Sequence, residues 1–137
     1  MTDAAVELQT LGDSFRHFLS QECPVNQAAA IATNPHKAKE IWQGMADLGW
    51  FGLLVAEDHG GLAMGYPELA RLYIEAGRCL VPVPILQAQL ALELVERCAT
   101  KNQKTRWLTD MLSGEMRVGA HPAIATHGLP VLSNNHI

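Results

Sequence analysis

Gln87 is the polar residue whose position in the sequence calls most for a chemical explanation. It projects from residues 85–98 on the apolar face that it shares with Ala91 and Leu94. The other polar residues of this segment follow a narrow stripe on the opposite side: Gln89, Glu93, Glu96 and Arg97. A buried amide costs about 1–3 kcal/mol unless it is hydrogen-bonded. Two interpretations stay open: Gln87 satisfies a carbonyl of the preceding proline-rich turn or of a neighbouring helix, or it lines a pocket wall with Ala91 and Leu94.

A second group that could do chemistry is the run Glu57-Asp58-His59. A carboxylate beside an imidazole is a common acid–base pairing. Adjacent residues in a turn usually point apart, however, and an acidic residue before Gly60-Gly61 more often bonds turn amides. The turn interpretation is therefore favoured over catalysis.

Other chemistry finds little support in the sequence. The six histidines show no HExxH motif and no close grouping with cysteine. The three in the tail, His121, His127 and His136, are spaced too loosely for a metal site, so we expect them to be solvated. No nucleophile motif and no phosphate-binding glycine motif occurs, and residues 48–65 contain no lysine or arginine. The three cysteines are widely spaced and are expected to be reduced thiols. We assign no catalytic, cofactor-binding or metal-ligating residue.

Residues 48–65 form the connection around which the remaining elements should be arranged. Five glycines alternate there with large apolar side chains and one short acidic break. Leaving each large side chain in water would forgo about 1.5–3 kcal/mol. Ordered loops of this length are uncommon and are usually compact or functional. The sequence therefore predicts a packed, ordered loop.

The chain on both sides of this loop has helical periodicity. The expected helices cover about 3–21, 35–48, 67–78, 85–98 and 100–112. Asn34 is an expected N-cap, Gly49 and Gly114 are expected terminators, and Thr100 opens a capping box. The buried stripe of the second helix should include Leu48. On the third helix, the charged residues are expected to form a solvated face: Glu68, Arg71, Glu75 and Arg78.

Composition agrees with a folded all-α domain. The chain has 137 residues, 48% of them hydrophobic, and a net charge of −4. No basic stripe is present to neutralise phosphates, so neither nucleic acid nor an anionic membrane is an expected partner. No signal peptide and no run of about 18 apolar residues is found, which predicts a cytoplasmic protein without a membrane span. Residues 116–137 are expected to be coil or strand fragments.

Several of these segments, taken together, resemble the N-terminal helical domain of the acyl-CoA dehydrogenases. The first is LGWFGLLVAEDHGGLAMG; the others are Glu75-Ala76-Gly77-Arg78, Pro82-Val83-Pro84 and QKTRWL running into Ser113-Gly114-Glu115. Ala56 and Ala63 stand where the family usually has proline and glycine. The resemblance implies a five-to-six-helix domain over residues 1–115. Residues 116–137 would then be coil or the start of a truncated middle β-domain.

The resemblance also implies the family's chemistry, which is FAD-dependent α,β-dehydrogenation of acyl-CoA thioesters. The family's flavin contacts and its catalytic glutamate lie mainly in domains that follow this one, so we expect that this chain alone neither binds FAD nor completes a catalyst. Oligomers or heteromeric partner subunits are expected instead. In the family the segment corresponding to 85–94 forms part of the acyl-chain wall, which favours Gln87, Ala91 and Leu94 as pocket residues. The alternative is a flavin-free helical interaction or regulatory module on the same scaffold.

Overall fold

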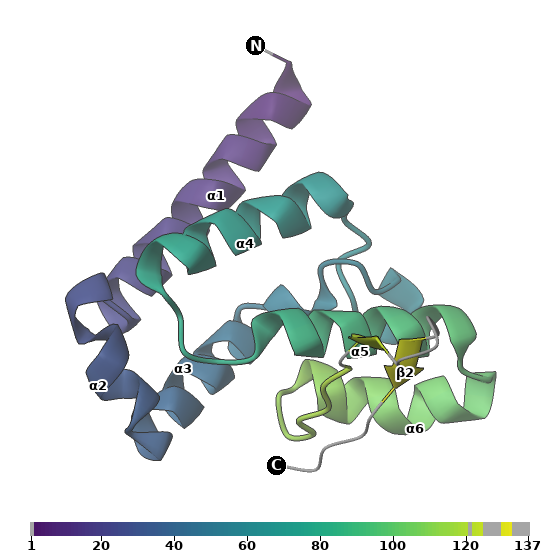
Figure 1. Cartoon of the computed structure of the whole chain (residues 1–137). Helices are drawn as coiled ribbons and strands as arrows, with labels where there is room; N and C mark the ends of the chain where they lie inside the picture. Colours follow the sequence, from purple (N-terminus) through teal and green to yellow (C-terminus); the bar gives the residue numbers. More distant parts are fainter. Residues whose placement is uncertain (1, 121, 125–129, 133–137) are drawn as a thin grey trace. The chain divides into compact units, whose positions relative to one another are not determined.

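The computed structural model describes residues 2–120, 122–124 and 130–132. The described part contains six α-helices, three short 3-10 helices and one pair of short strands (Figure 1). The chain divides into two compact units. The first comprises Met1–Met45 and Met64–Val83, and the second comprises Ala46–Ala63 and Pro84–Ile137. The predicted all-α domain is confirmed.

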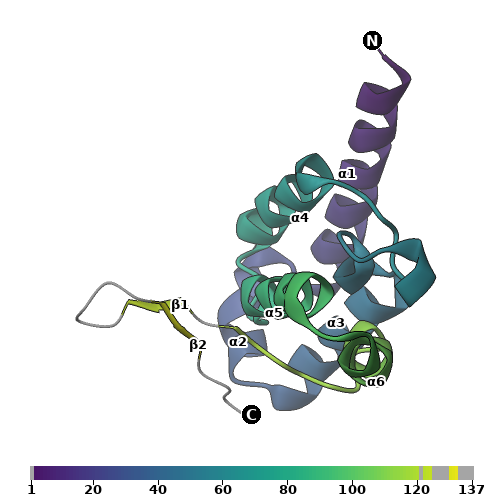
Figure 2. The same cartoon turned by 90° about the vertical axis from the view of Figure 1, so that its right-hand side faces the viewer.

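Two long helices form the centre of the first unit. Helix α1 (Asp3–Glu22) packs along α4 (Tyr66–Cys79), and Figures 1 and 2 both show them side by side. The two helices run in the same direction. Gly12 of α1 lies against Arg71 of α4, and one turn further along both helices Arg16 binds Glu75. Apolar side chains on the two helices are buried: Phe15, Leu19, Leu69 and Leu72. Burial of each contributes about 1.5–3 kcal/mol.

The first unit also contains the short elements η1 (Val25–Gln27) and α2 (Ala28–Ala32), followed by most of α3 (Pro35–Asp47). Neither η1 nor α2 was expected from the sequence. Asn34 caps α3 as predicted, since its Oδ1 accepts the Lys37 N–H at 3.2 Å. The prediction for Leu48 was wrong: the helix ends at Asp47 and the Leu48 side chain is exposed. Gly49 has a left-handed φ of 77°, so it turns the chain away directly after Leu48.

The second unit begins with the connection that the sequence singled out. It contains η2 (Trp50–Gly52) and η3 (Glu57–His59), and the side chains of Trp50, Phe51, Leu53 and Val55 are buried. The packed, ordered loop is therefore confirmed for its first half. Leu62 and Met64 are exposed by 41% and 38%, so the expectation of burial was wrong at the end of the segment. A close backbone approach explains Gly61, where a Cβ would lie 2.0 Å from the carbonyl oxygen of Val55.

Helices α5 (Ile85–Cys98) and α6 (Lys101–Leu112) pack against each other and contact this connection. Both helices lie close to their predicted positions. The Thr100 capping box is present, with the Thr100 hydroxyl accepting the Gln103 N–H, and Gly114 has a φ of 78° after α6. Beyond them, β1 (Pro122–Ile124) pairs antiparallel with β2 (Pro130–Leu132), which agrees with a strand-like tail. The boundary predicted at residue 115 stays a prediction.

Candidate functional site

The predicted pocket wall lies along α5, where Gln87, Ala91 and Leu94 occupy one face at helical spacing. Ala91 is buried with 4% of its surface exposed, whereas Gln87 and Leu94 are half-buried. The main chain after α6 returns to this face. The Ala120 N–H donates to the Gln87 carbonyl at 3.0 Å, and a Cβ at Gly119 would lie 3.1 Å from the Cβ of Gln87. Residues 119–120 therefore cover part of Gln87.

Gln89, and not Gln87, is the buried amide that α5 uses to hold its neighbour. The sequence placed Gln89 on a solvated stripe, which is wrong, because only 3% of the residue is exposed. Its Nε2 donates a hydrogen bond of 2.8 Å to the carbonyl of Trp50. Periodicity along one helix cannot reveal that another segment covers the polar stripe at this position. The hydrogen bond fixes η2 on α5.

His59 has a partner that its sequence neighbours did not suggest. Its Nδ1 lies 3.0 Å and 3.1 Å from the two carboxylate oxygens of Glu96 on α5. Glu57 and Asp58 are exposed, so the acid–base run does not converge on one point. The His59 side chain is 31% exposed and paired. This pair joins η3 to α5 and orients the imidazole through one nitrogen. The tail histidines that were expected to be solvated lie outside the described residues: His121, His127 and His136.

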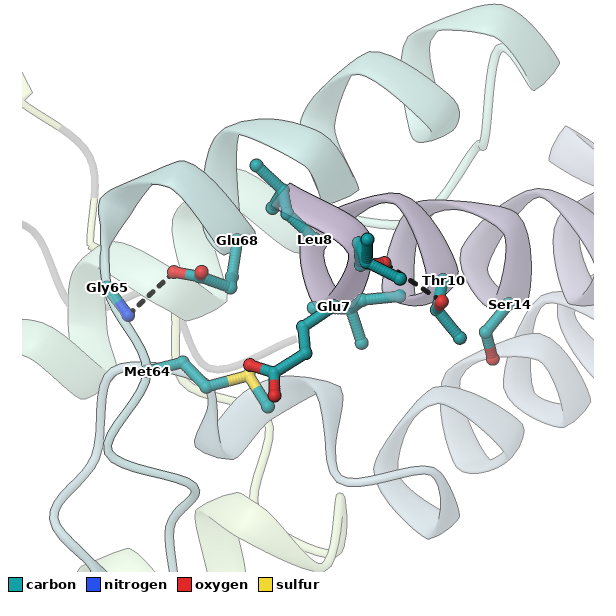
Figure 3. Close-up of a pocket in the computed structure, with 9 residues that line it drawn as sticks. Glu7, Leu8, Thr10, Ser14, Met64, Gly65 and Glu68 are labelled. Carbon is teal, nitrogen blue, oxygen red and sulfur yellow. Dashed lines mark hydrogen bonds between the residues drawn. The ribbon is translucent and has the colours of Figure 1, made fainter. Parts of the chain in front are cut away.

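A pocket of about 530 Å³ lies between the first half of α1 and the start of α4 (Figure 3). Apolar side chains make up much of its lining, together with two hydroxyls and two carboxylates: Val6, Glu7, Leu8, Thr10, Leu11, Ser14, Met64, Gly65 and Glu68. Glu68 accepts the Gly65 N–H at 2.9 Å and so caps α4, while Glu7 on α1 and Met64 before α4 are both part of the lining (Figure 3). None of Gln87, Ala91 and Leu94 lines this pocket.

The charge of this pocket limits what it can bind. Its lining contains two acidic side chains and no basic one. A diphosphate, as in a flavin or nucleotide cofactor, needs positive charge or free backbone amides. The pocket is therefore suited to an apolar group and unsuited to a phosphate. Sequence reasoning missed it because the two helices that form it are 44 residues apart, from the end of α1 to the start of α4.

The described residues also lack a cradle for a diphosphate in the glycine-rich connection. No lysine or arginine occurs between residues 48 and 65, and the side of Gly61 that would carry a Cβ is packed against the Val55 carbonyl. Across residues 2–120 and the two strands, no cluster of three or more histidine, cysteine or acidic side chains could hold a metal ion. Within the same residues no helix is long and apolar enough to span a membrane.

Glu75 is the most deeply buried charged group that the structure describes, with 1% of the residue exposed. The prediction that it belongs to a solvated face was wrong. Arg16 forms two hydrogen bonds with its carboxylate, Nε–Oε2 at 3.1 Å and Nη2–Oε1 at 2.9 Å. Arg71 and Arg78 approach the same carboxylate at 3.7 Å and 3.8 Å. Periodicity within α4 could not reveal that α1 covers this position.

The Arg16 hydrogen bond holds the pKa of Glu75 below its ordinary value of 4.5, against the opposing effect of burial. The charges of the three arginines act in the same direction. The same hydrogen bond raises the pKa of Arg16. Nearby, burial alone raises the pKa of Tyr73 to about 12. This cluster joins α1 to α4 and is structural in character, since its carboxylate is enclosed by the arginines.

Comparison with known proteins assigns the chain to a family. Residues 6–115 match the model of the acyl-CoA dehydrogenase N-terminal domain. The chain therefore belongs to the acyl-CoA dehydrogenase family. A curated relative is the (2S)-methylsuccinyl-CoA dehydrogenase of Cereibacter sphaeroides, which is 28% identical over 112 residues. That match covers 80% of this chain and 20% of the relative.

Solved structures show the same fold. A variant of the Tcur3481-Tcur3483 steroid ACAD has a TM-score of 0.72 at 24% identity, covering 82% of this chain and 31% of the solved one. The ChsE4-ChsE5 complex from Mycobacterium tuberculosis has a TM-score of 0.69 at 19% identity, covering 85% and 29%. The chain thus spans between a fifth and a third of the length of these relatives.

Proposed function

We propose that this chain supplies the N-terminal helical domain of an FAD-dependent acyl-CoA dehydrogenase. The observation that carries the proposal is the family match over residues 6–115, which spans all six helices but the first three residues of α1. The named relative acts on a CoA thioester, (2S)-methylsuccinyl-CoA, which supports a substrate of the same general class. A cytoplasmic location, expected from the sequence, is part of the proposal and is tested by fractionating native cells.

The division of labour in this proposal follows from what the described residues offer. Bound FAD would accept the hydride that leaves the β-carbon of the acyl group, while a base removes the α-proton. Neither the acid-lined pocket nor the connection 48–65 suits a diphosphate, so we assign flavin binding to domains of the kind that follow this one in the family. The helical domain would bury the acyl chain and exclude water. The names of the two solved complexes support a heteromeric assembly for this chain.

Flavin titration tests this division. The purified chain is titrated with FAD, alone and together with a polypeptide that carries the family's middle and C-terminal domains. We expect retained flavin only in the assembly, and bleaching of its visible absorbance when acyl-CoA is added without oxygen. Tight binding of FAD by the chain alone would contradict the proposal. An assembly that forms but never retains flavin would favour the interaction-module alternative.

Within such an assembly, we propose that Gln87, Ala91 and Leu94 form part of the acyl-chain wall. Shortening the half-buried Leu94 to alanine should enlarge the site and raise kcat/KM for longer thioesters relative to shorter ones by about tenfold, the value of one or two buried methylenes. The control is Leu86→Ala on the same helix, where the side chain is 51% exposed. If Leu94→Ala lowers kcat/KM equally for thioesters of all chain lengths, Leu94 does not line the acyl-chain site.

A further inference from the structure

Two cysteines meet where the long helices of the first unit end. Cys23 directly follows α1 as its C-cap residue, and Cys79 is the last residue of α4. The Cys23 thiol donates a weak hydrogen bond to the Cys79 carbonyl oxygen, with the sulfur 3.9 Å from that oxygen. A carbonyl oxygen lies about 2.4 Å from its own Cα, so the Cys23 sulfur is within about 6 Å of the Cys79 Cα. The parallel course of the helices is what brings these two residues together.

The Cys79 side chain also faces α1. Residues four apart lie on the same face of a helix, and Cys79 follows Glu75 by four positions. The Glu75 carboxylate is directed at Arg16 of α1. Cys23 is fully buried and Cys79 is half-buried, so the pair has one protected thiol and one that small solutes can reach. Cys98, by contrast, is exposed near the end of α5.

From this geometry we propose that Cys23 and Cys79 form a redox-sensitive pair, which closes into a disulfide when a hydroperoxide reaches the protein. Closure requires the Cys23 thiol to leave the Cys79 carbonyl oxygen by side-chain rotation, together with any shift of the helix ends needed to hold the two Cα atoms within about 7 Å. The bond would join the C-terminal ends of α1 and α4. It would therefore lock the side-by-side arrangement that the Arg16–Glu75 ion pair already stabilises.

One molecule of hydrogen peroxide is sufficient to oxidise the two thiols to a disulfide. The thiolate of the accessible Cys79 attacks one peroxide oxygen, the O–O bond breaks, and a sulfenic acid and water result after proton transfer. The Cys23 sulfur then attacks the sulfenic sulfur, which forms the S–S bond and releases a second water. In total, two thiols lose two protons and two electrons, and one hydrogen peroxide is reduced to two waters.

The surroundings set the rate of this reaction. Burial raises the pKa of both thiols. A neighbouring negative charge raises each further, that of Cys79 on Cys23 and that of Glu75 on Cys79, whereas the positive charge of Lys37 lowers the pKa of Cys23. Since the thiolate is the reacting form, closure should be slow near neutral pH and should accelerate as the pH rises. The pair is thus suited to prolonged oxidation and unsuited to rapid signalling.

The test uses the whole chain with the exposed third thiol removed, Cys98→Ser. The protein is incubated with hydrogen peroxide, unfolded, alkylated and weighed intact. We expect the number of alkylated thiols to fall from two to none, to return to two after dithiothreitol, and a peptide linking Cys23 to Cys79 to appear in a non-reducing digest. The rate should rise at least tenfold from about pH 7 to about pH 9, following the thiolate fraction.

Matched variants separate closure from general oxidation. With Cys23→Ser in the Cys98→Ser background, the remaining Cys79 should stop at a sulfenic acid that dimedone labels, with no internal cross-link. If the chain keeps two alkylatable thiols under conditions that oxidise Cys98 in the unmodified protein, the proposal is wrong. It is equally wrong if the only disulfides found join separate molecules. The decisive measurement needs no substitution in the core, so a variant that fails to fold does not affect it.

Discussion

At the scale of the single residue, the buried carboxylate of Glu75 requires a positively charged partner. Its carboxylate is removed from water and receives two hydrogen bonds from Arg16 on another helix. Leaving either member of a buried pair without its partner is costly, because the remaining charge or donor loses both water and its partner. The ion pair therefore fixes the register of α1 against α4 as well as adding stability.

Replacing Glu75 with glutamine should lower the free energy of unfolding by about 2–3 kcal/mol, below the full cost of a broken buried pair because the arginines are partly exposed to water. Urea unfolding followed by circular dichroism measures the change. The control is Glu40→Gln, whose carboxylate forms surface ion pairs and is 52% exposed, with an expected change within about 0.5 kcal/mol. Equal effects of the two substitutions would show that burial of Glu75 does not matter.

A second prediction concerns the buried amide of Gln89 and its contribution to stability. Gln89→Met keeps much of the shape but removes the donor to the Trp50 carbonyl, so it should cost about 1–3 kcal/mol. Gln87→Met on the same helix is the matched control, since Gln87 is half-buried and should change stability by less than about 0.5 kcal/mol. Both are measured by thermal and urea unfolding. A larger loss in the Gln87 variant would reverse the assignment of the structural amide on α5.

At the scale of the element, glycines in the connection and in α4 should respond oppositely to alanine. At Gly61 a Cβ would lie 2.0 Å from a backbone oxygen, so Gly61→Ala must displace the loop and should cost about 2–3 kcal/mol. At Gly77, within α4, a Cβ would meet nothing within 4 Å, so Gly77→Ala should stabilise by about 0.5–1 kcal/mol. Differential scanning calorimetry should give Tm changes of opposite sign. Hydrogen exchange in residues 52–63 should rise only in the Gly61 variant.

The helices and turns also show which structural features a single sequence can predict. Local signals were sufficient for α5, for the capping box at Thr100 and for the left-handed turn at Gly49, because each depends on residues close in the chain. The errors fall where a distant segment covers a helix. Glu75 and Gln89 both follow a polar stripe, yet α1 covers the first and η2 covers the second. The α1–α4 pocket was missed for the same reason, whereas the wall at Gln87, Ala91 and Leu94 stays a prediction.

At the scale of the whole molecule, the family match explains why the described residues combine an ordered scaffold with few chemical groups. Side-chain caps hold the starts of α3, α4 and α6, the two units have buried cores, and paired charges join one element to another. The pocket between α1 and α4 is lined mainly by apolar side chains, with the two carboxylates of Glu7 and Glu68 and no basic group. These features are compatible with the proposed division of labour, in which the groups that carry out the reaction belong to other domains.

Acid should destabilise the molecule partly through Glu75, and the sign follows from its pKa. Because the folded-state pKa lies below the ordinary 4.5, the unfolded chain binds a proton more readily between the two values. The stabilisation is fully present above about pH 4.5 and is lost as the pH falls through the folded-state pKa. The stability gap between the unmodified protein and Glu75→Gln should therefore be constant from about pH 7 to about pH 5, and should shrink as the pH falls through the folded-state pKa of Glu75. Urea unfolding at each pH measures it, with Glu40→Gln as the reference for general acid effects. A gap that stays undiminished as the pH is lowered well below 4.5 would mean that the ionised carboxylate is not the stabilising form.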